Sequence, residues 1–577
     1  MTYHICDKML RDCAAVAASI IITIAGTISA DAQQKPNGNI AGDKLPELGL
    51  PLDIPLILSG NFGELRRNHF HSGLDFKTQG RTGLTVRSAD DGYVSRIVAS
   101  PWGFGRAVYV THPTTGLTTV YGHLEAFSPA IDKRARAEQY ARETFSIDMN
   151  FLPGEIQVKR GEAIGRSGNS GSSGGPHLHM DVRDTHTGDP LDPMVYYRRH
   201  IKDAVAPEVR ALGLYAVDGE GDVAGTSTLV PAKFAQGFTA WGRVVPAIKA
   251  YDRMSGTTNI YGVKHLALEV DGKEVYRRTI DRFSFDNTRA VNTLTDYAGV
   301  INNGSWMMWT QIPDAEPLGD MIRTVDRGTL LINEERDYHC RWILEDEHGN
   351  RKTQPFTIHG RKADIPERES KGSLIDHRGR NTFNVDGVEV TFPKGTFYND
   401  GYISITSTPS DKYLTPVYSV GSATVPVSGE FEVNINVQCP PAITPEKLCL
   451  VRLTPKGGSA RVDATWREGR MEGRPSALGR FTVTTDTVAP KVRPVKPETW
   501  GRNGRVKYVL SDNLSGIKTY RGTIDGKYAL FELDGKTATA TFVMDPSRFT
   551  KGKKHEVVMT ATDACGNTTT SHDTFIW

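Results

Sequence analysis

Residues 167–183 read SGNSGSSGGPHLHMDVR, a run of glycine and serine that leads into a His-Leu-His triplet. Successive side chains of a β-strand alternate between its two faces, so His177 and His179 are expected on one face while Leu178 faces the core. A phosphate-binding loop requires Gly-Lys-Ser/Thr and a following helix, whereas Pro176 and a predicted strand follow here. We interpret the small residues as the low wall of a groove, where the backbone can approach an extended peptide.

Two shorter motifs upstream supply partners for these histidines. His71 and Asp75 lie four residues apart in HFHSGLDF (residues 69–76), and His123 lies in TTVYGHL (residues 118–124). Imidazole and carboxylate groups are both good zinc ligands. An isolated His-x-x-x-Asp spacing is common, however, and a surface histidine near a solvated aspartate explains it more simply. The motifs have to be taken together before they indicate a site.

Taken together, the motifs predict a catalytic metal centre. Its three expected protein ligands are His71, Asp75 and His179. Three ligands leave a fourth position for water, which is typical of catalytic zinc, whereas a structural zinc site is closed, usually by cysteine. The sequence has no cysteine near these motifs. His123 and His177 stay uncoordinated in this interpretation, and they are available for proton transfer or charge stabilisation.

HFHSGLDF, TTVYGHL and GNSGSSGGPHLHMDVR occur in the order found in the lysostaphin/LytM-type zinc metallopeptidases, which cut peptidoglycan peptides. The chain resembles that family over residues 55–195, about a quarter of its length. The resemblance implies a small antiparallel β fold with a long groove. It also implies zinc ligands at His71, Asp75 and His179, and a catalytic pair at His123 and His177.

The chain departs from the shorter members of that family after His123. The inserted stretch AFSPAIDKRARAEQYARETFSIDMNFLPGEI has helix-forming composition from Ala135 to Phe145, and we expect it beside the groove. Near the other end of the site, Asp181 lies two residues beyond His179 on the same strand face. We consider it as a carboxylate that orients an imidazole.

The whole chain has 577 residues, too many for one hydrophobic core, and a formal net charge of +2. This near balance gives no general argument for a nucleic-acid partner. Short runs rich in Val, Thr and Ile alternate with Gly and Pro turn signals, which is typical of an all-β protein with several domains. We predict an antiparallel β peptidase domain with a groove, followed by three β-sandwich-like modules.

Three sequence markers recur in the same order, which indicates a diverged internal repeat. DAVAPEV (203–209) recurs as DTVAPKV (486–492), YDRMSGTTNIYGV (251–263) as SDNLSGIKTYRG (511–522), and EDEHGN (345–350) as TDACGN (562–567). The Asp-x-x-Ser-Gly pieces are able to bind calcium, but turn residues that hydrogen-bond their own backbone explain them more simply. We interpret both units as immunoglobulin-like sandwiches, the first with insertions.

These patterns divide the chain into six segments. We expect a signal peptide at 1–32, a LytM-type zinc peptidase domain at 48–200, an immunoglobulin-like domain with insertions at 201–360, a charged linker at 361–380, a β-sandwich-like domain at 381–484 and an immunoglobulin-like domain at 485–577. Arrays of sandwiches bury their own cores, so a fragment ending near Arg199 is expected to keep its chemistry. The alternative is that the first sandwich packs over the groove and shapes it.

The N-terminus has a weakly basic start, an apolar stretch from Ala14 to Ala30 and a small-residue cleavage site, which together predict an export signal. The alternative is a membrane anchor, for which the apolar run is at the short limit. In an oxidising compartment Cys439 and Cys449, which flank a predicted turn, would form a hairpin disulfide. Two buried thiols are the alternative.

The sequence therefore predicts an exported zinc-dependent endopeptidase that hydrolyses peptide cross-links of peptidoglycan in the periplasm or cell envelope. In a Gram-negative cell the resemblance implies the D-alanyl to diaminopimelate cross-link, although no residue selects it over a glycine bridge. The alternative function is a non-catalytic wall-binding scaffold or activator of another wall hydrolase. The C-terminal modules are expected to bind the wall or an envelope protein partner, or to act as spacers, and no nucleic-acid partner is expected.

Overall fold

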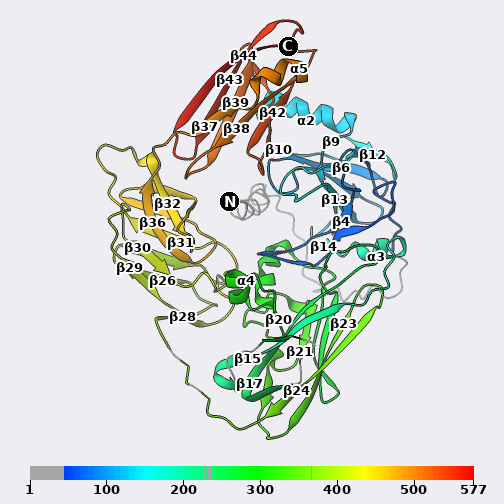
Figure 1. Ribbon diagram of the computed structural model, residues 1–577, viewed down its shortest axis with the longest axis vertical. Coiled ribbons are helices and arrows are strands. Elements are labelled where there is room, and N and C mark those ends of the chain that lie inside the picture. The colour runs from blue at the N-terminus through cyan, green and yellow to red at the C-terminus, as the bar shows by residue number, and fades with distance from the viewer. Residues whose placement is uncertain (1–44, 225–228, 232–236, 366, 369) are drawn as a thin grey trace, which may run out of the picture.

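The computed structural model describes residues 45–224, 229–231, 237–365, 367–368 and 370–577. The expected signal peptide at residues 1–32 lies outside these residues. Within the described ranges, no helix is long and apolar enough to cross a lipid bilayer. Strands joined into sheets dominate the chain (Figure 1), which confirms the predicted all-β, multi-domain class.

The first unit, residues 48–201, is built on an antiparallel sheet. Its central strands are buried along most of their length, and Val108 and Val110 of β7 are fully buried. Across the sheet the order is β1 (Leu58–Gly60), β4 (Leu74–Lys77), β13 (His177–Asp184), β8 (Leu117–Leu124), β7 (Arg106–His112), β6 (Gly92–Ala99) and β10 (Ile147–Asn150), with β11 (Gln157–Val158) on β6 and β14 (Pro190–Leu191) on β13. Smaller pieces are the sheet β5 (Thr85–Arg87), β12 (Ala163–Arg166) and β9 (Ala126–Phe127), the hairpin β2 (Leu65–Arg66) and β3 (His69–Phe70), and α3 (Met194–Tyr197).

The insertion after His123 forms helix α2 (Pro129–Ala141). Proline is favoured at the first position of a helix because its φ is already helical, and this start signal was missed in the expectation of a helix over residues 135–145. Ile131, Ala135 and Gln139 are four residues apart and bury one face of α2. The helix ends before Glu143, whose φ of 47° is left-handed.

The second unit, residues 208–360, carries one sheet of ten strands with insertions, as its length predicted. The strand order is β16 (Leu229–Pro231), β15 (Glu208–Val223), β17 (Phe238–Tyr251), β24 (Arg351–Gly360), β23 (Asp337–Glu345), β18 (His265–Val270), β19 (Lys273–Thr279) and β21 (Ile322–Thr324), with β20 (Met308–Trp309) and β22 (Leu330–Ile332) on β17. The inserted residues include a 3₁₀ segment at Phe285–Leu294 and α4 (Tyr297–Asn303). The predicted Asp-Gly turn joins β18 to β19 through Asp271 and Gly272, both with positive φ.

The first and second units share a hydrophobic core. The ring of Phe283 lies 5.3 Å from that of Phe62 and 5.0 Å from that of Phe70. The Phe70 amide also donates to Thr288 Oγ1 at 3.0 Å, across the same boundary. Phe62 and Phe70 are 4 % and 2 % exposed in a core that includes Phe283 of the second unit. This arrangement is at odds with the expectation that a fragment ending near Arg199 keeps its function.

The third and fourth units each pair two sheets across a core. The third has β26 (Asn381–Val385), β27 (Val388–Phe392), β31 (Glu432–Asn436), β35 (Arg470–Gly473) and β34 (Ala464–Arg467) facing β29 (Ile405–Thr408), β30 (Val417–Val420), β36 (Gly479–Thr485), β32 (Leu448–Leu453) and β33 (Ser459–Arg461), and a pair formed by β25 (Ser373–Ile375) and β28 (Gly401–Ile403). The fourth has β37 (Lys491–Pro494), β38 (Arg505–Ser511), β42 (Thr539–Val543) and β41 (Glu532–Asp534) facing β40 (Lys527–Ala529), β39 (Ile517–Ile524), β43 (Lys554–Asp563) and β44 (Thr568–Ile576), with α5 (Trp500–Asn503). β25 lies inside the segment 361–380 that was expected to be a linker.

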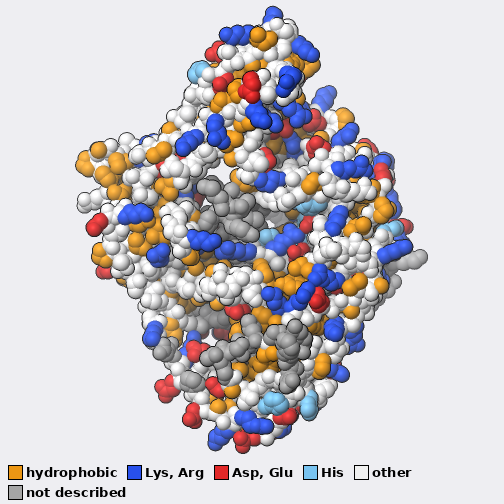
Figure 2. All heavy atoms as spheres, viewed as in Figure 1, with side chains coloured by type: hydrophobic (Ala, Val, Ile, Leu, Met, Phe, Trp, Pro, Cys, Tyr) orange, Lys and Arg blue, Asp and Glu red, His pale blue; other side chains and the backbone are white. Residues whose placement is uncertain are grey.

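The four units follow one another around a ring, so the fourth unit meets the first (Figure 1). Tyr140 of α2 packs edge-on against Tyr528 of β40, with ring centroids 5.8 Å apart. Arg106 of β7 forms an ion pair with Glu532 of β41 at 2.6 Å. The insertion in the first unit is thus a docking surface for the last unit. Figure 2 shows acidic and basic side chains interspersed over one face of the ring, in keeping with the balanced net charge.

The cysteines do not form the hairpin disulfide that was considered. Cys340, Cys439, Cys449 and Cys565 are all unbonded in the described chain. Cys449 packs with Cys565 of the fourth unit in a small buried cluster, while Cys439 Sγ lies 3.0 Å from the carbonyl of Ile443. The alternative of free thiols therefore describes the pair at 439 and 449.

Candidate metal centre and histidine pair

Neighbouring strands bring the five predicted site residues together. β4 carries Asp75, β13 carries His177 and His179, and His123 lies near the end of β8. In the β4–β13 ladder His179 lies directly opposite Asp75. Leu178, on the other face of β13, is fully buried, as the strand alternation predicted.

Three buried side chains converge with the geometry of a metal-ligand set. Asp75 Oδ1 lies 3.0 Å from His71 Nε2 and 2.9 Å from His179 Nδ1, and the two nitrogens are 3.1 Å apart. Each imidazole is held by its other nitrogen: His71 Nδ1 lies 2.7 Å from the Asn61 carbonyl, and His179 Nε2 lies 2.6 Å from Asp181 Oδ1. With a metal ion bound, those outer nitrogens would carry the protons and the converging nitrogens would present lone pairs to the ion. The residues therefore fit a divalent metal ion.

The charges around this group favour an ionised carboxylate at its centre. Burial raises the pKa of Asp75, but the charge of His71 and hydrogen bonds from the surrounding imidazoles outweigh it and hold that pKa well below the usual range. Burial lowers the pKa of His71. Burial also lowers the pKa of His179, but the charge and hydrogen bond of Asp181 raise it to about 9. A metal ion that binds here therefore displaces a proton from His179.

Arg66 is a further part of the centre that the motifs did not indicate. Its Nη2 donates to Asp75 Oδ2 at 2.9 Å, so the carboxylate offers only Oδ1 to the converging nitrogens. Arg66 ends β2, and the β2–β3 hairpin places it over Asp75. Its only sequence signal was its position three residues before His69 in a basic pair, which is a common surface pattern.

Asp181 makes the imidazole contact that was predicted for it. It is fully buried and accepts from Arg183 Nε at 2.9 Å as well as from His179. The charge of Arg183 contributes to lowering the pKa of Asp181 to about 2, against the opposing effect of burial. A chain of Arg183, Asp181 and His179 thus fixes the ring that faces Asp75. The ring of Phe104 stacks on the ring of His179, with the two centroids 4.7 Å apart.

The remaining two histidines form a pair beside the ligand group. Their ring centroids are 4.7 Å apart, and His177 Nε2 lies 3.4 Å from Asp75 Oδ1. His123 Nδ1 lies 2.8 Å from the Ser170 carbonyl, and His177 Nδ1 lies 2.8 Å from the Gly175 carbonyl. Both Nδ1 atoms therefore carry the proton, which leaves each Nε2 with a lone pair for a reacting group. Both carbonyls belong to the Gly/Ser run.

The Gly/Ser run thus sets the tautomer and direction of the histidine pair. Its glycines also allow close packing: a Cβ on Gly171, which has a φ of 69°, would lie 2.3 Å from the amide nitrogen of Gly105. Gly174 and Gly175 face open space. His123 itself has a left-handed φ of 59°, a strained conformation that its surroundings impose. Its amide donates to the Phe104 carbonyl at 2.7 Å.

A first prediction concerns the protonation of His123. Burial, and then the charges of His177 and His179, lower the pKa of His123 to about 3. Because the folded protein keeps His123 neutral, this histidine favours the folded state fully only above its pKa in the unfolded chain, which is about 6.5. That stability is lost as the pH falls through the folded pKa of about 3. We expect the ring resonances of His123 to stay in the neutral position from pH 8 to pH 5 in a ¹³C-edited NMR titration.

The exposed His186 provides the internal reference for that titration. Movement of the His123 resonance between pH 8 and pH 5 would show that its ring gains a proton in that range. It would contradict the role of His123 as a neutral imidazole that accepts a proton at Nε2.

Comparisons with known proteins add to this geometry. A family model described as a Zu5-like domain matches residues 373–486. DD-carboxypeptidase/endopeptidase Mpg of Neisseria meningitidis serogroup B is 32 % identical over 124 residues, which are 22 % of this chain and 22 % of that protein. The same-named protein of Neisseria gonorrhoeae has the same identity and coverage. The chain thus spans about a fifth of the length of the curated relatives it matches.

Solved structures give partial matches to the chain. A zinc-containing peptidase from Vibrio cholerae is 26 % identical, with 25 % of this chain and 38 % of that chain covered and a TM-score of 0.19. The catalytic domain of lysostaphin from Staphylococcus simulans is 21 % identical, with 24 % and 89 % covered and a TM-score of 0.18.

The similarity to the Mpg proteins confirms the resemblance that the motifs indicated. This chain contains a domain of the lysostaphin/LytM type, followed by β-rich units that include a Zu5-like domain.

Proposed function

We propose that this protein is an exported, zinc-dependent endopeptidase that hydrolyses peptide cross-links of peptidoglycan. The convergence of His71, Asp75 and His179 beside a pair of histidines held by their Nδ1 atoms carries the proposal. The Mpg proteins are named as DD-carboxypeptidases and endopeptidases, and this supports a peptide bond between D-configured centres as the target. No observation in the described chain favours the non-catalytic alternative.

The protein side chains have distinct roles in the proposed reaction. Zinc, when bound, supplies Lewis acidity toward the scissile carbonyl and lowers the pKa of a water molecule. His71, Asp75 and His179 hold the ion, and Arg66 and Asp181 orient two of these ligands.

His123 and His177 provide the acid–base chemistry. With each Nδ1 bonded to a backbone carbonyl, an Nε2 of the pair would take the proton of the attacking water, and the imidazolium so formed would return that proton to the leaving amine. The sequence has no His-Glu-x-x-His motif that would place a glutamate base beside the ligands, so this work falls to the histidine pair.

We further propose an export signal at residues 1–32 and zinc peptidase chemistry confined to residues 48–200. The later divisions are proposed as the sequence predicts them, except that β25 belongs to the third unit and not to the linker. The remaining units, which include the Zu5-like match at 373–486, are proposed to bind the wall or an envelope partner. Because the fourth unit contacts α2 and Arg106, such binding is positioned to hold the first unit close to an insoluble substrate.

A direct test uses a purified disaccharide–tetrapeptide dimer as substrate. The zinc-loaded protein is expected to convert the dimer to monomers, activity is expected to stop after treatment with a chelator, and added zinc is expected to restore it. Full activity after the zinc has been removed would contradict the proposal.

A second prediction separates the ligands from the catalytic pair. Asp75→Ala removes the oxygen at the centre of the ligand group, so zinc content is expected to fall from about one ion per chain to near zero. His123→Ala is expected to keep nearly the wild-type content, because its ring does not join the converging atoms. Elemental analysis of both purified variants is the measurement. An equal loss of zinc in both would contradict the division of roles.

A further inference from the structure

The two sequence repeats place three aspartates at equivalent positions. Asp203, Asp252 and Asp346 begin or lie within the three markers of the second unit, and Asp486, Asp512 and Asp563 occupy the same places in the fourth. Ligand atoms of the three fourth-unit aspartates lie within 4.8 Å of one another. In the second unit the atoms that lie so close are those of Asp203, Asp346 and His348, and Asp252 lines a small cavity with these residues.

Much of this arrangement is shared turn chemistry. Asp346 Oδ1 accepts from the amides of His348 and Asn350 at 2.8 Å each, and Asn350 Nδ2 donates to Asp346 Oδ2 at 2.8 Å. Asp563 makes the same three bonds with Cys565 and Asn567. Asx turns of this kind explain the Gly-Asn marker without a ligand.

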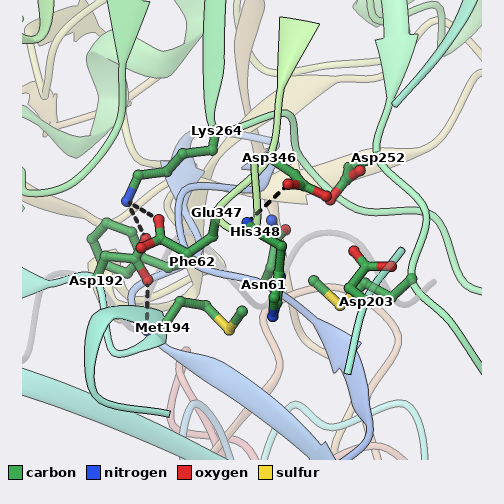
Figure 3. A pocket seen from close by; sticks show the side chains of 11 residues that line it. Asn61, Phe62, Asp192, Met194, Asp203, Asp252, Lys264, Asp346, Glu347 and His348 are labelled. Carbon is green, nitrogen blue, oxygen red and sulfur yellow. Dashed lines mark hydrogen bonds and ion pairs between the residues drawn. The ribbon is translucent and has the colours of Figure 1, made fainter. Parts of the chain in front are cut away.

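Asp252 is the residue that turn chemistry leaves unexplained. It is 2 % exposed, and in the described part of the chain its Oδ1 has no hydrogen-bond partner. Oδ2 of Asp203 is also buried without a partner among the described residues. A buried carboxylate oxygen without a donor is costly, so both atoms call for a proton or a cation. Figure 3 shows the Asp252 side chain directed toward Asp346.

The ammonium group of Lys264, which lines the same pocket, forms ion pairs with two other carboxylates. Lys264 Nζ donates to Asp192 Oδ2 and lies 3.2 Å from Glu347 Oε2, on the other side of the pocket in Figure 3. Burial, and then the charges of Asp346 and Asp203, raise the pKa of Asp252 to about 8, with no positive side chain among the causes. Lys264 therefore does not neutralise the unpartnered oxygens of Asp252 and Asp203.

The second cluster differs in the partners of its middle aspartate. Asp512 is partly exposed, and its Oδ2 accepts from the amides of Leu514 and Gly516 at 3.0 and 2.8 Å. Lys447 Nζ lies 2.6 Å from Asn567 Oδ1, beside Asp563. Asp512 Oδ1 is buried without a partner among the described residues, as Asp252 Oδ1 is. The fourth unit differs in that Lys447 lies beside its cluster, whereas Lys264 in the second unit is paired with Asp192 and Glu347.

A small cavity lies among the three second-unit aspartates. Its volume is about 10 Å³, and its lining also includes Asn61 and Phe62 of the first unit. That space holds about one water-sized particle. Carboxylate oxygens are the ligands that calcium prefers, in an irregular geometry that magnesium accepts poorly.

We propose that Asp203, Asp252 and Asp346 bind one calcium ion at the junction between the first and second units. The sequence repeat, the two unpartnered carboxylate oxygens and the ion-sized cavity all support this site. His348 lies at the same junction, where its Nε2 donates to the Ile201 carbonyl at 2.8 Å. The ion joins carboxylates from three separate segments of the second unit next to residues of the first.

The position of the site gives calcium a role in holding the catalytic unit. Asn61 lines the cavity, and its side chain exchanges hydrogen bonds with the backbone of Gly262 at 2.8 and 2.9 Å. The carbonyl of the same Asn61 accepts from His71 Nδ1. Calcium therefore stabilises a junction that is connected through Asn61 to His71, a ligand of the proposed zinc centre. This stabilisation does not depend on whether that centre is catalytic.

The experiment is equilibrium dialysis of the full-length protein against ⁴⁵Ca²⁺, with thermal unfolding in parallel. Wild type is expected to bind calcium at the second-unit site and to gain about 5 °C in Tm at saturation. Asp252→Asn is expected to bind about one calcium fewer per chain and to lose the Tm gain. Asp512→Asn, the equivalent change in the fourth unit, is the matched control and is expected to keep the calcium that Asp252→Asn loses.

The calcium-free Tm of Asp252→Asn distinguishes a lost ligand from a damaged fold. Asparagine buries no charge, so this Tm is expected to equal or exceed that of calcium-free wild type. Wild-type calcium stoichiometry in Asp252→Asn, or a calcium-free Tm below that of wild type, would overturn the proposal. An equal Tm gain with magnesium would overturn the assignment to calcium.

Discussion

Replacing His179 with alanine is expected to reduce cleavage of a cross-linked muropeptide dimer by on the order of 10⁴-fold, because the metal centre is lost with its ligand. His179 Nδ1 is one of three atoms within 3.1 Å of one another, and its other nitrogen is bonded to a buried carboxylate. The alanine variant therefore loses a metal ligand and leaves Asp181 with Arg183 as its remaining charged partner. The measurement is kcat/KM on the dimer, together with zinc content.

Two further variants sharpen this prediction. Asp181→Asn keeps the size of the side chain but removes the charge behind His179, so zinc affinity is expected to fall about 10- to 100-fold. His186→Ala changes an exposed histidine outside the ligand group and is expected to match wild type. A His179→Ala protein that retains wild-type kcat/KM would exclude His179 from the reaction.

Removing the second unit is expected to unfold the first. Phe62 and Phe70 pack against Phe283, and full exposure of each costs about 2 kcal/mol. The bonds from Asn61 to Gly262 and from Phe70 to Thr288 are lost with the same cut. These losses sum to several kcal/mol, which is comparable with the lower end of a typical domain stability of about 5–15 kcal/mol.

The measurement compares two fragments by circular dichroism, thermal unfolding and zinc content. Residues 45–360, which retain the shared core, are expected to fold cooperatively and bind zinc. Residues 45–199 are expected to show no cooperative transition near that of the longer fragment. A fragment 45–199 that melts at the temperature of 45–360 and binds zinc would show that the first unit folds alone, as the sequence had suggested.

The candidate site could be assembled from the sequence because its residues lie in short motifs with strong local rules. Strand alternation correctly placed His177 and His179 opposite Leu178, and it placed Asp181 beside His179. The Gly/Ser run was interpreted as a groove wall. Its clearest role in the structure is to supply the carbonyls of Ser170 and Gly175 to the histidine pair. Backbone carbonyls leave no trace in residue identity, so this role was not predictable.

Other contributions depend on contacts between residues distant in sequence. Arg66 reaches Asp75 through a two-strand hairpin that has no strong propensity signal. Phe283 lies in an insertion with no apolar periodicity that would indicate its partner Phe62. The contact between α2 and the fourth unit closes the ring and joins segments separated by about two thirds of the chain, as the 5.8 Å distance between the Tyr140 and Tyr528 rings shows. A repeat pattern can indicate units, but it gives no information about which surfaces they share.

The most direct test of the central claim is the digestion of purified sacculi, followed by mass spectrometry of the muropeptides. Wild type loaded with zinc is expected to convert cross-linked dimers into monomers. His177→Ala is expected to keep its zinc but to lose about 10²- to 10⁴-fold in rate, because one member of the acid–base pair is absent. Intact cross-links after wild-type digestion, or equal conversion by wild type and His177→Ala, would contradict the account.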